Sequence, residues 1–229
     1  MTTRIYLIRH GATLLSSEDR FAGATDVPLS PAGRDQVRLL AGRLADYTLA
    51  AVYCSPLHRT VETAEIIALP HGLTPILRDG LREVDHGHWE GMLRSEVEAQ
   101  FPEEYAAWEE DPVTFAPSGG ETGISVMARA LPVIRDIVLK HDDQNIAVVS
   151  HKATIRLVMS SLLGFDARGY RDRLDQLPAC LNVLDFRDPV HVRLMLFNDV
   201  SHYENQPPRS SSRLSRWWDE PEPGPTPPS

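Results

Sequence analysis

Cysteine is scarce in this sequence: only Cys54 and Cys180 occur among 229 residues. The two lie far apart, and neither belongs to the CxxC spacing that zinc sites and dithiol sites use. This scarcity excludes a disulfide framework and a cysteine-based structural metal site, and it favours a reducing compartment.

Long hydrophobic runs are also missing. No apolar stretch is long enough for a membrane helix or for the central part of a signal peptide, and a strand-like run at residues 5–8 follows soon after Met1. We therefore expect a cytoplasmic protein without a membrane partner.

Excess positive charge is the third absence. The chain carries 23 Lys and Arg against 32 Asp and Glu, which gives a net charge of −9 with neutral His. Attraction of the whole molecule to nucleic acid or to an anionic membrane is not expected. An anionic substrate must therefore be bound by a local group of basic residues.

The composition that remains is that of an ordinary globular domain, with 42% hydrophobic and 24% charged residues. Residues 206–229 differ, because they hold seven of the 18 prolines, a run of serines and few aliphatic side chains. We predict one domain over residues 1–205 and a disordered tail over residues 206–229. The adjacent Trp217 and Trp218 leave open that the tail docks on a partner or on the domain.

Short apolar runs alternate with helix-like stretches through the domain, a pattern typical of βαβ units and a largely parallel sheet. Ser30 and Pro31 predict the start of one helix, and Ser55 and Pro56 predict the start of another. Strands are predicted over residues 5–8, 51–54, 75–77, 145–149, 181–186 and 192–197, and later helices within 94–110, 126–139 and 155–163.

Charged side chains follow several of these strands, at the sheet edge where open α/β sheets bind ligands. Arg9 and His10 follow the first strand, and Arg59 lies shortly after the second. Glu83 follows the third strand, and His151 follows the strand at 145–149. Two histidines, two arginines and a carboxylate are therefore expected to meet at one edge of the sheet.

These residue types suit the transfer of a phosphoryl group from an ester without a metal. Guanidinium groups such as Arg9 and Arg59 hold a phosphate dianion well. A neutral imidazole can attack phosphorus, so one histidine acts as the nucleophile and the other as a charge stabiliser. The leaving alkoxide needs a proton, and a carboxyl group beside a bound dianion favours its protonated form, which assigns this task to Glu83.

Six blocks of sequence carry a resemblance to a known family. LIRHG at 7–11 is followed by FAGATDVPLSPAG at 21–33, SPLHRTVETA at 55–64, LREVDHGHWEG at 81–91, GGE at 119–121 and SH at 150–151. In this order they resemble the histidine phosphatase superfamily, also called the phosphoglycerate mutase-like family, over about positions 4 to 165. The resemblance implies a three-layer α/β/α sandwich around a mostly parallel sheet, and catalysis that needs no metal or other cofactor.

The resemblance also implies a role for each residue at the sheet edge. His10 is the phosphorylated nucleophile, and Arg9, Arg59 and His151 hold the phosphoryl oxygens. Glu83 is first the acid and then the base. Judged from the residues alone, three other carboxylates compete with Glu83 for this role: Glu65, Glu90 and Glu121.

Departures from the family pattern concern the rim of the phosphate site. Where many members have Glu and Asn after the RHG triplet, this chain has Ala12 and Ser16, and a frequent polar side chain is replaced by Ala22. We predict that Ser16, or alternatively Ser17, restores a hydrogen bond to phosphate. Lys152 stands where many members have Gly, so its amide can face phosphate while its ammonium adds positive charge for a second anionic group.

A metal site is a competing interpretation of Asp85, His86 and His88, because carboxylate and imidazole groups bind zinc, manganese or iron. The HxH pair lacks a third and a fourth ligand at a recognisable spacing. We therefore predict no metal.

The predicted function is a metal-independent phosphomonoesterase that hydrolyses a small soluble ester, such as phosphoserine or a sugar phosphate, through a phosphohistidine at His10. One alternative is a phosphoglycerate mutase of the 2,3-bisphosphoglycerate-dependent type. Mutases of the family that this chain resembles carry a long extra segment between the acid and the GGE block. In this chain the interval from Glu83 to Gly119 is short and acidic. The sequence thus favours hydrolysis.

A second alternative is a non-catalytic protein that binds a phospho-ligand or a partner. The presence of His10, Arg59, Glu83 and His151 together argues against it, because a pseudoenzyme would have lost the nucleophile or the acid. A homodimer formed through an edge strand remains open.

Overall fold

The computed structural model describes residues 2–15 and 18–204. Within these residues one six-stranded sheet has the strand order β3-β2-β4-β1-β5-β6. Neighbours from β3 to β1 are parallel, whereas β5 runs antiparallel to both β1 and β6. The strands are β1 (Thr3–Arg9), β2 (Ala51–Cys54), β3 (Ile76–Leu77), β4 (Asn145–Ser150), β5 (Leu181–Phe186) and β6 (Val192–Asp199).

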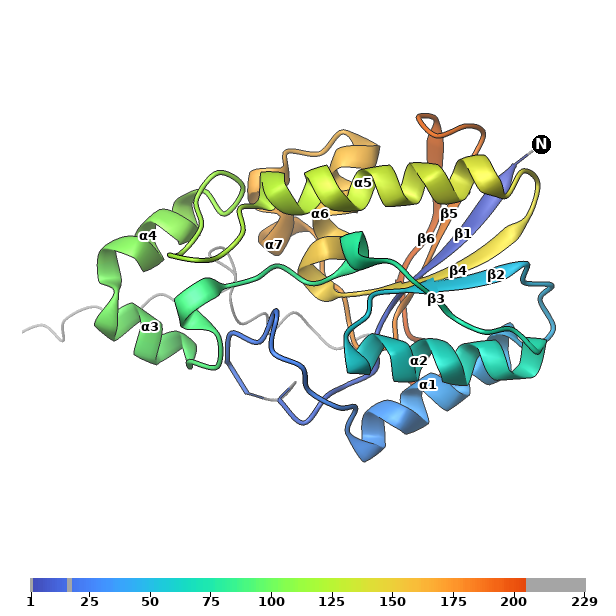
Figure 1. Ribbon diagram of the computed structural model, residues 1–229, viewed down its shortest axis with the longest axis horizontal. Coiled ribbons are helices and arrows are strands. Elements are labelled where there is room, and N and C mark those ends of the chain that lie inside the picture. The colour runs from blue at the N-terminus through green and yellow to red at the C-terminus, as the bar shows by residue number, and fades with distance from the viewer. Residues whose placement is uncertain (1, 16–17, 205–229) are drawn as a thin grey trace, which may run out of the picture.

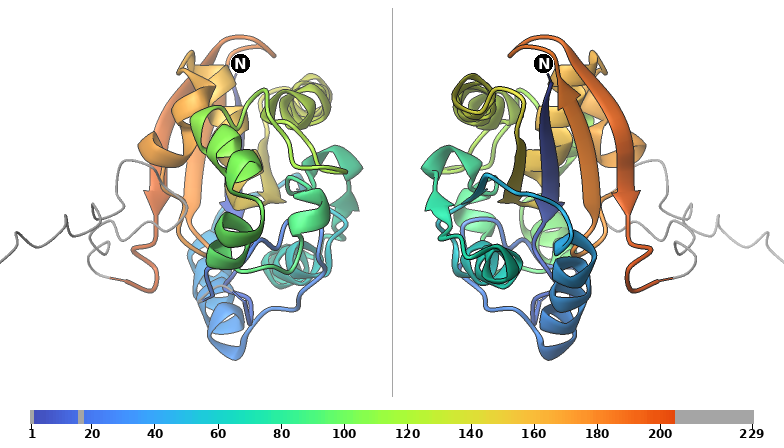
Figure 2. Two further views of the ribbon diagram at one scale, coloured as in Figure 1. Left: turned by 90° about the vertical axis from the view of Figure 1, so that its left-hand side faces the viewer. Right: turned by 90° about the vertical axis from the view of Figure 1, so that its right-hand side faces the viewer.

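Helices cover both faces of the sheet, with α1 and α2 on one face and α5 and α6 on the other (Figure 1). Figure 2 shows β6 at one edge of the sheet. The α-helices are α1 (Pro31–Leu44), α2 (His58–Ala68), α3 (Arg94–Gln100), α4 (Pro102–Glu110), α5 (Gly123–Lys140), α6 (Lys152–Leu163) and α7 (Tyr170–Arg173). The short 3₁₀ helices are η1 (Leu69–His71), η2 (Asp79–Leu81), η3 (Gly87–Trp89) and η4 (Ala167–Gly169).

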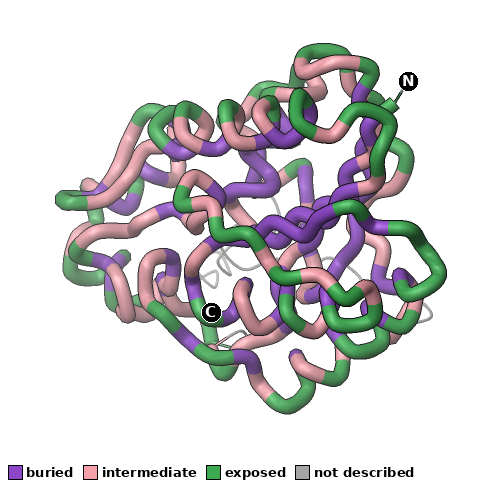
Figure 3. Tube along the Cα trace, turned by 45° about the vertical axis from the view of Figure 1, so that its right-hand side comes forward, coloured by how far each residue is buried: buried purple, intermediate pink, exposed green. Residues whose placement is uncertain are grey.

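Alternation along β1 explains the three layers. Tyr6 and Ile8 pack with the buried faces of α1 and α2, while Ile5 and Leu7 pack with those of α5 and α6. Successive side chains of a strand point to opposite faces, so a strand that is apolar on both faces needs a helical layer on each. The tube in Figure 3 is buried along the central strands and exposed on the outer turns of the helices. The predicted α/β sandwich with a mostly parallel sheet is confirmed.

The predicted start of α1 is also confirmed. Ser30 is the N-cap, and its hydroxyl oxygen accepts a hydrogen bond from the amide of Gly33 at 3.0 Å. Pro31 occupies the first helical position, where its missing N–H has no intrahelical partner to lose.

The predicted start of α2 is wrong. Helix α2 begins at His58 behind Leu57, which makes no side-chain cap. The Ser55 hydroxyl accepts a long hydrogen bond from the amide of Leu57 at 3.4 Å and is also hydrogen-bonded to the ring of His151, 2.8 Å away. Its side chain is thus shared between the local turn and a tertiary contact.

Beyond the carboxyl ends of β1 and β4, the chain from α3 to α4 forms a separate small lobe (Figure 1). Its centre is an aromatic cluster with an aliphatic side chain: Phe21, Trp89, Val97, Tyr105 and Trp108. Within residues 2–15 and 18–204, no helix is both long and apolar enough to cross a membrane. The predicted tail at 206–229, with Trp217 and Trp218, lies outside the described residues.

Candidate active site

A pocket of about 520 Å³ lies where β1 and β4 end. Of the described residues that line it, six are Lys or Arg and four are Asp or Glu. The pocket is therefore locally positive in a chain whose net charge is −9. Its basic residues are Arg9, Arg20, Arg59, Lys152, Arg156 and Arg171, and its acidic residues are Glu18, Asp19, Glu83 and Asp175.

His10 follows β1 and lines the pocket with only 6% of its surface exposed. Its Nδ1 lies 2.7 Å from the carbonyl oxygen of Gly11. Because a carbonyl only accepts, the neutral ring carries its proton on Nδ1, which leaves the lone pair on Nε2. Burial, reinforced by the charges of Arg59 and Arg9, lowers the pKa of His10 well below its usual value. The ring is therefore neutral at neutral pH, with a lone pair on Nε2.

His151 caps α6 directly after β4, and its ring centroid lies 5.2 Å from that of His10. Arg59 donates from Nε to Nδ1 of His151 at 3.2 Å, so the ring proton is on Nε2 and points to Ser55. Burial and the neighbouring Arg59 lower the pKa of His151 well below its usual value. His151 is fully buried, and both of its ring nitrogens have protein partners.

Arg59 projects from the first turn of α2 and is held on every side. Besides the bond to His151, it donates from Nη1 to the carbonyl oxygen of Thr25 at 2.8 Å and from Nη2 to that of Gly23 at 2.7 Å. Arg9 donates from Nη1 to the carbonyl oxygen of Gln176 at 2.6 Å. Each terminal nitrogen of Arg59 carries a second N–H that these carbonyls do not use, so the fixed guanidinium can still bind an anion.

Glu83 lines the same pocket and is anchored at the N-terminus of α6. Its Oε2 accepts a hydrogen bond from the amide of Ala153, and its Oε1 accepts from the amide and the hydroxyl of Thr154, each at 3.0 Å. These donors fix the position of the carboxyl group beside the residues at the end of β4.

The competing carboxylates occupy other places. Glu65 is exposed on α2. Glu90 accepts from the amides of Gly23 and Thr25 at 3.0 and 3.1 Å, and Glu121 forms an ion pair with Arg129 at 2.8 Å. Among the described residues, Glu83 is the one of these four carboxylates that lines the pocket.

A profile of the histidine phosphatase superfamily, branch 1, matches residues 5–200. The chain belongs to this family. It is 37% identical over 163 residues to phosphoserine phosphatase 1 of Hydrogenobacter thermophilus. This alignment covers 71% of this chain and 77% of that protein. It is 32% identical over 168 residues to glucosyl-3-phosphoglycerate phosphatase of Mycolicibacterium vanbaalenii. This alignment covers 70% of this chain and 74% of that protein.

The solved structure of Bacillus stearothermophilus YhfR is similar to this histidine phosphatase, with a TM-score of 0.83 and 29% identity over 88% of this chain and 100% of that one. The resemblance seen in the sequence is thus confirmed. A phosphatase family and relatives named as phosphatases make this chain a phosphoric monoester hydrolase.

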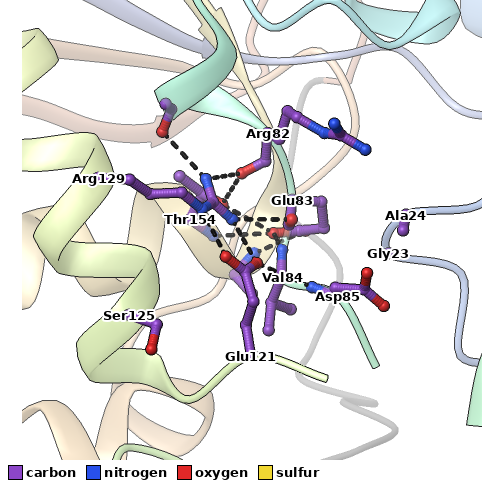
Figure 4. Close-up of polar contacts among 12 residues, drawn as sticks. Gly23, Ala24, Arg82, Glu83, Val84, Asp85, Glu121, Ser125, Arg129 and Thr154 are labelled. Carbon is purple, nitrogen blue, oxygen red and sulfur yellow. Dashed lines mark hydrogen bonds and ion pairs between the residues drawn. The ribbon is translucent and has the colours of Figure 1, made fainter. Parts of the chain in front are cut away.

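An arginine that the sequence did not single out holds the backbone at Glu83. Arg129 of α5 donates from Nη1 to the carbonyl oxygen of Arg82 at 2.7 Å and from Nη2 to that of Glu83 at 2.9 Å. Glu121 holds Arg129 in turn, through Nε and Nη2 (Figure 4). In this histidine phosphatase the GGE block therefore fixes the backbone that carries Glu83. Arg129 lies in an ordinary helical sequence, so no local signal marked it.

The residues of the competing metal interpretation do not converge. Asp85 accepts from the amide of Gly87, His86 packs edge-on against Phe21, and His88 pairs with Glu104 at 3.3 Å. Among the described residues, no three or more His, Cys, Asp or Glu side chains are arranged to hold a metal ion.

Of the two predicted residues at the phosphate rim, Lys152 lines the pocket and lies 3.8 Å from Asp175. Burial, followed by the charges of Arg156 and Arg9, lowers the pKa of Lys152 to about 7. Ser16 lies outside the described residues, and its contact with phosphate stays a prediction.

Proposed function

We propose that this histidine phosphatase hydrolyses a small phosphate monoester through a phosphohistidine at Nε2 of His10. The observation that carries the proposal is the hydrogen bond from Nδ1 of His10 to the carbonyl oxygen of Gly11, in a ring that burial keeps neutral. A neutral imidazole with its lone pair on Nε2 attacks phosphorus without first losing a proton.

In the first step, Nε2 of His10 forms a bond to phosphorus while the bond from phosphorus to the ester oxygen breaks. Arg9 and Arg59 hold the equatorial oxygens, where negative charge persists through the transition state. Glu83 gives its proton to the leaving oxygen, so an alcohol departs and a carboxylate remains. The carbonyl of Gly11 keeps its bond to Nδ1 of the now cationic ring.

In the second step, a water molecule attacks phosphorus and the bond to Nε2 breaks. Glu83, now ionised, takes a proton from the water, and the electron pair returns to the ring of His10. Free phosphate leaves, and both side chains regain their starting states. The anchoring of Glu83 by Ala153 and Thr154 supports one residue acting in both steps, because it holds the carboxyl group in one place.

His151 is assigned a supporting role at the phosphoryl oxygens. Its Nδ1 accepts from Arg59 and its Nε2 donates to Ser55, so a direct bond to phosphate requires one of these bonds to open. Ser16 and the amide of Lys152 complete the phosphate site in this proposal, which leaves the ammonium of Lys152 for a second anionic group.

A cytoplasmic location and a homodimer are further parts of the proposal. Cys54 and Cys180 are free thiols, which fits a reducing compartment. Ile76 and Leu77 on the edge strand β3 are 44% and 54% exposed, which supports pairing of two copies through this edge. Sedimentation equilibrium of the wild type and of Leu77→Lys tests the dimer.

The decisive experiment is phosphate release from a panel of phosphomonoesters, with EDTA present and phosphoglycerate mutase activity measured in parallel. Release that resists EDTA, together with a trapped phosphohistidine that is absent from His10→Ala, supports the proposal. Isomerisation of 3-phosphoglycerate without release assigns a mutase instead. Absence of both activities assigns a binding protein.

A further inference from the structure

Three basic side chains from α6 and α7 line the pocket but take no part in the proposed steps at phosphorus. They are Lys152, Arg156 and Arg171, called here the helix cluster. Arg156 and Arg171 are only 4% and 5% exposed, although burial of a guanidinium group is costly. A buried group of cations beside a pocket needs partners to offset this cost.

The guanidinium groups of the helix cluster lack part of those partners. Among the described residues, Nε of Arg156 and both Nε and Nη1 of Arg171 are buried without a hydrogen-bond acceptor. Buried polar atoms in folded proteins are almost always hydrogen-bonded, so donors left unpaired at a pocket wall indicate a ligand that accepts from them.

The acidic residues of the protein neutralise the helix cluster incompletely. Asp175 accepts from Nη2 of Arg156 at 3.0 Å and lies 3.8 Å from Nζ of Lys152. Arg171 donates from Nη2 to the carbonyl oxygen of Glu109 at 2.9 Å, and its guanidinium lies 3.9 Å from the ring centroid of Trp108. These carbonyl and ring partners carry no full negative charge. Asp175 thus contacts two of the three basic side chains, and Lys152 is only partly protonated near its pKa of about 7. The two guanidinium charges exceed the charge of this one carboxylate, so an added anion is favoured.

The position of the helix cluster relative to Glu83 indicates which part of the substrate it meets. Glu83 is bonded to the amides of Ala153 and Thr154, which directly follow Lys152 on the first turn of α6. Since Glu83 protonates the leaving oxygen, the alcohol portion of the ester lies on this side of the phosphoryl group.

We propose that the helix cluster binds a carboxylate on the alcohol portion of the substrate, so that the enzyme selects phosphate esters of small hydroxy acids. This inference rests on the proposed function. A carboxylate suits the orphaned donors, because its two oxygens accept side by side from one guanidinium. A second phosphate suits them less, because the pocket already holds the reacting dianion together with four acidic side chains.

The test compares esters that differ in one group. We expect kcat/KM for 3-phosphoglycerate to exceed that for glycerol 3-phosphate by about 10- to 100-fold, the worth of a hydrogen-bonded ion pair. A ratio near one, or a higher value for 2,3-bisphosphoglycerate than for 3-phosphoglycerate, overturns the proposal. Phosphoserine and phosphoethanolamine form a second pair that also differs by a carboxylate.

Variants assign the preference to the cluster. Arg171→Met and Lys152→Met should each bring the 3-phosphoglycerate to glycerol 3-phosphate ratio at least about fivefold closer to one, whereas Lys140→Met, which removes an exposed lysine far along α5, should keep the wild-type ratio. A wild-type ratio in both cluster variants overturns the proposal. Arg171 is buried, so its variant can fail to fold. The side chain of Lys152 is 33% exposed, so its variant measures the ester preference independently.

Calorimetry separates failure of this inference from failure of the proposed function. Binding of 3-phosphoglycerate and of glycerol 3-phosphate to His10→Ala measures the carboxylate preference without turnover. Tighter binding of 3-phosphoglycerate supports the helix cluster even if the wild type releases no phosphate from any ester. Equal binding, with normal hydrolysis of p-nitrophenyl phosphate by the wild type, overturns the helix cluster alone.

Discussion

Arg59 and Arg171 are two guanidinium groups in one pocket, and the protein treats them differently. Every nitrogen of Arg59 donates to an acceptor of the chain, on His151, Thr25 and Gly23. Arg171 uses one nitrogen, while its Nε and Nη1 have no acceptor among the described residues. A fully held guanidinium is set in one geometry, as a reaction at phosphorus requires. A guanidinium that is only partly held, such as that of Arg171, keeps N–H groups that can donate to the alcohol portion of the ester.

The difference supports the proposed separation of chemistry from selectivity. In that proposal the residues at the strand ends serve any phosphate monoester, and the helix cluster distinguishes among them. Substitutions at the strand ends should lower turnover of all esters alike, whereas those in the helix cluster should change their ranking.

Loss of the nucleophile tests the strand-end region most severely. We expect His10→Ala to lower kcat for p-nitrophenyl phosphate by more than about a thousandfold, because both ring nitrogens of the neighbouring His151 are engaged by Arg59 and Ser55. Steady-state release of nitrophenol measures it. The exposed His191→Ala is the matched control and should keep wild-type activity. Retention of most activity in His10→Ala would remove the phosphohistidine from the mechanism.

Replacing the acid tests whether Glu83 acts on the leaving group. Glu83→Gln should lower kcat by about 10²- to 10⁴-fold for alkyl esters, the usual worth of general acid–base catalysis. The loss of the phosphorylation rate should be smaller for p-nitrophenyl phosphate, because nitrophenolate leaves without a proton. Single-turnover measurements with both kinds of ester give this comparison. Equal losses in phosphorylation rate would assign Glu83 a positional role only.

A substitution of Arg59 tests directly whether this arginine differs in role from Arg171. Arg59→Lys should lower kcat/KM for 3-phosphoglycerate and for glycerol 3-phosphate by a similar factor of about 10 to 100, because it weakens bonds to the shared phosphoryl group. The measurement is kcat/KM for both esters in one preparation. A loss confined to 3-phosphoglycerate would place Arg59 with the helix cluster.

The smallest expected effect concerns stability. Burial lowers the pKa of His10 and of His151 in the folded chain, whereas unfolded histidines titrate near 6.5. Below about pH 6.5 the unfolded state therefore binds more protons, and the free energy of unfolding falls as the pH falls, by at most about 1.4 kcal/mol per pH unit for each histidine. Urea unfolding at pH 7 and pH 5.5 measures the slope.

His10→Asn should show a shallower slope than the wild type, and His191→Asn should show the wild-type slope. An unfolding free energy that is as large at pH 5.5 as at pH 7 would mean that these rings are protonated in the folded state.

The sequence predicted those parts of the site that follow directly from strand ends. Arg9, His10 and His151 are adjacent to apolar runs, and Glu83 shortly follows one, so their meeting at one sheet edge could be expected from topology. Ser30 and Pro31 fixed the start of α1 by a purely local rule. In these places, chain neighbours decide the structure.

Tertiary contacts decided what the sequence did not predict. Ser55 has the pattern of a cap, but α2 begins only at His58, and the Ser55 hydroxyl also bonds to His151, almost a hundred residues away along the chain. Arg156 and Arg171 read as ordinary helical arginines, and only packing around Asp175 and Trp108 shows that they are buried at the pocket. Burial of a long charged side chain depends on elements far apart in the sequence, so composition and spacing carry little of it.

The loop at residues 23–25 is fastened mainly through its main chain, with one side-chain hydrogen bond from Thr25 to Glu90. Its carbonyl groups receive Arg59, and its amides donate to Glu90. Main-chain groups are the same in every amino acid except proline, so other substitutions at Ala24 leave Arg59 and Glu90 with their partners. Gly23 is the exception, because a Cβ there would lie 1.8 Å from the carbonyl oxygen of Val84. The position of Arg59 is thus insensitive to the side chain at residue 24 and sensitive to the one at residue 23.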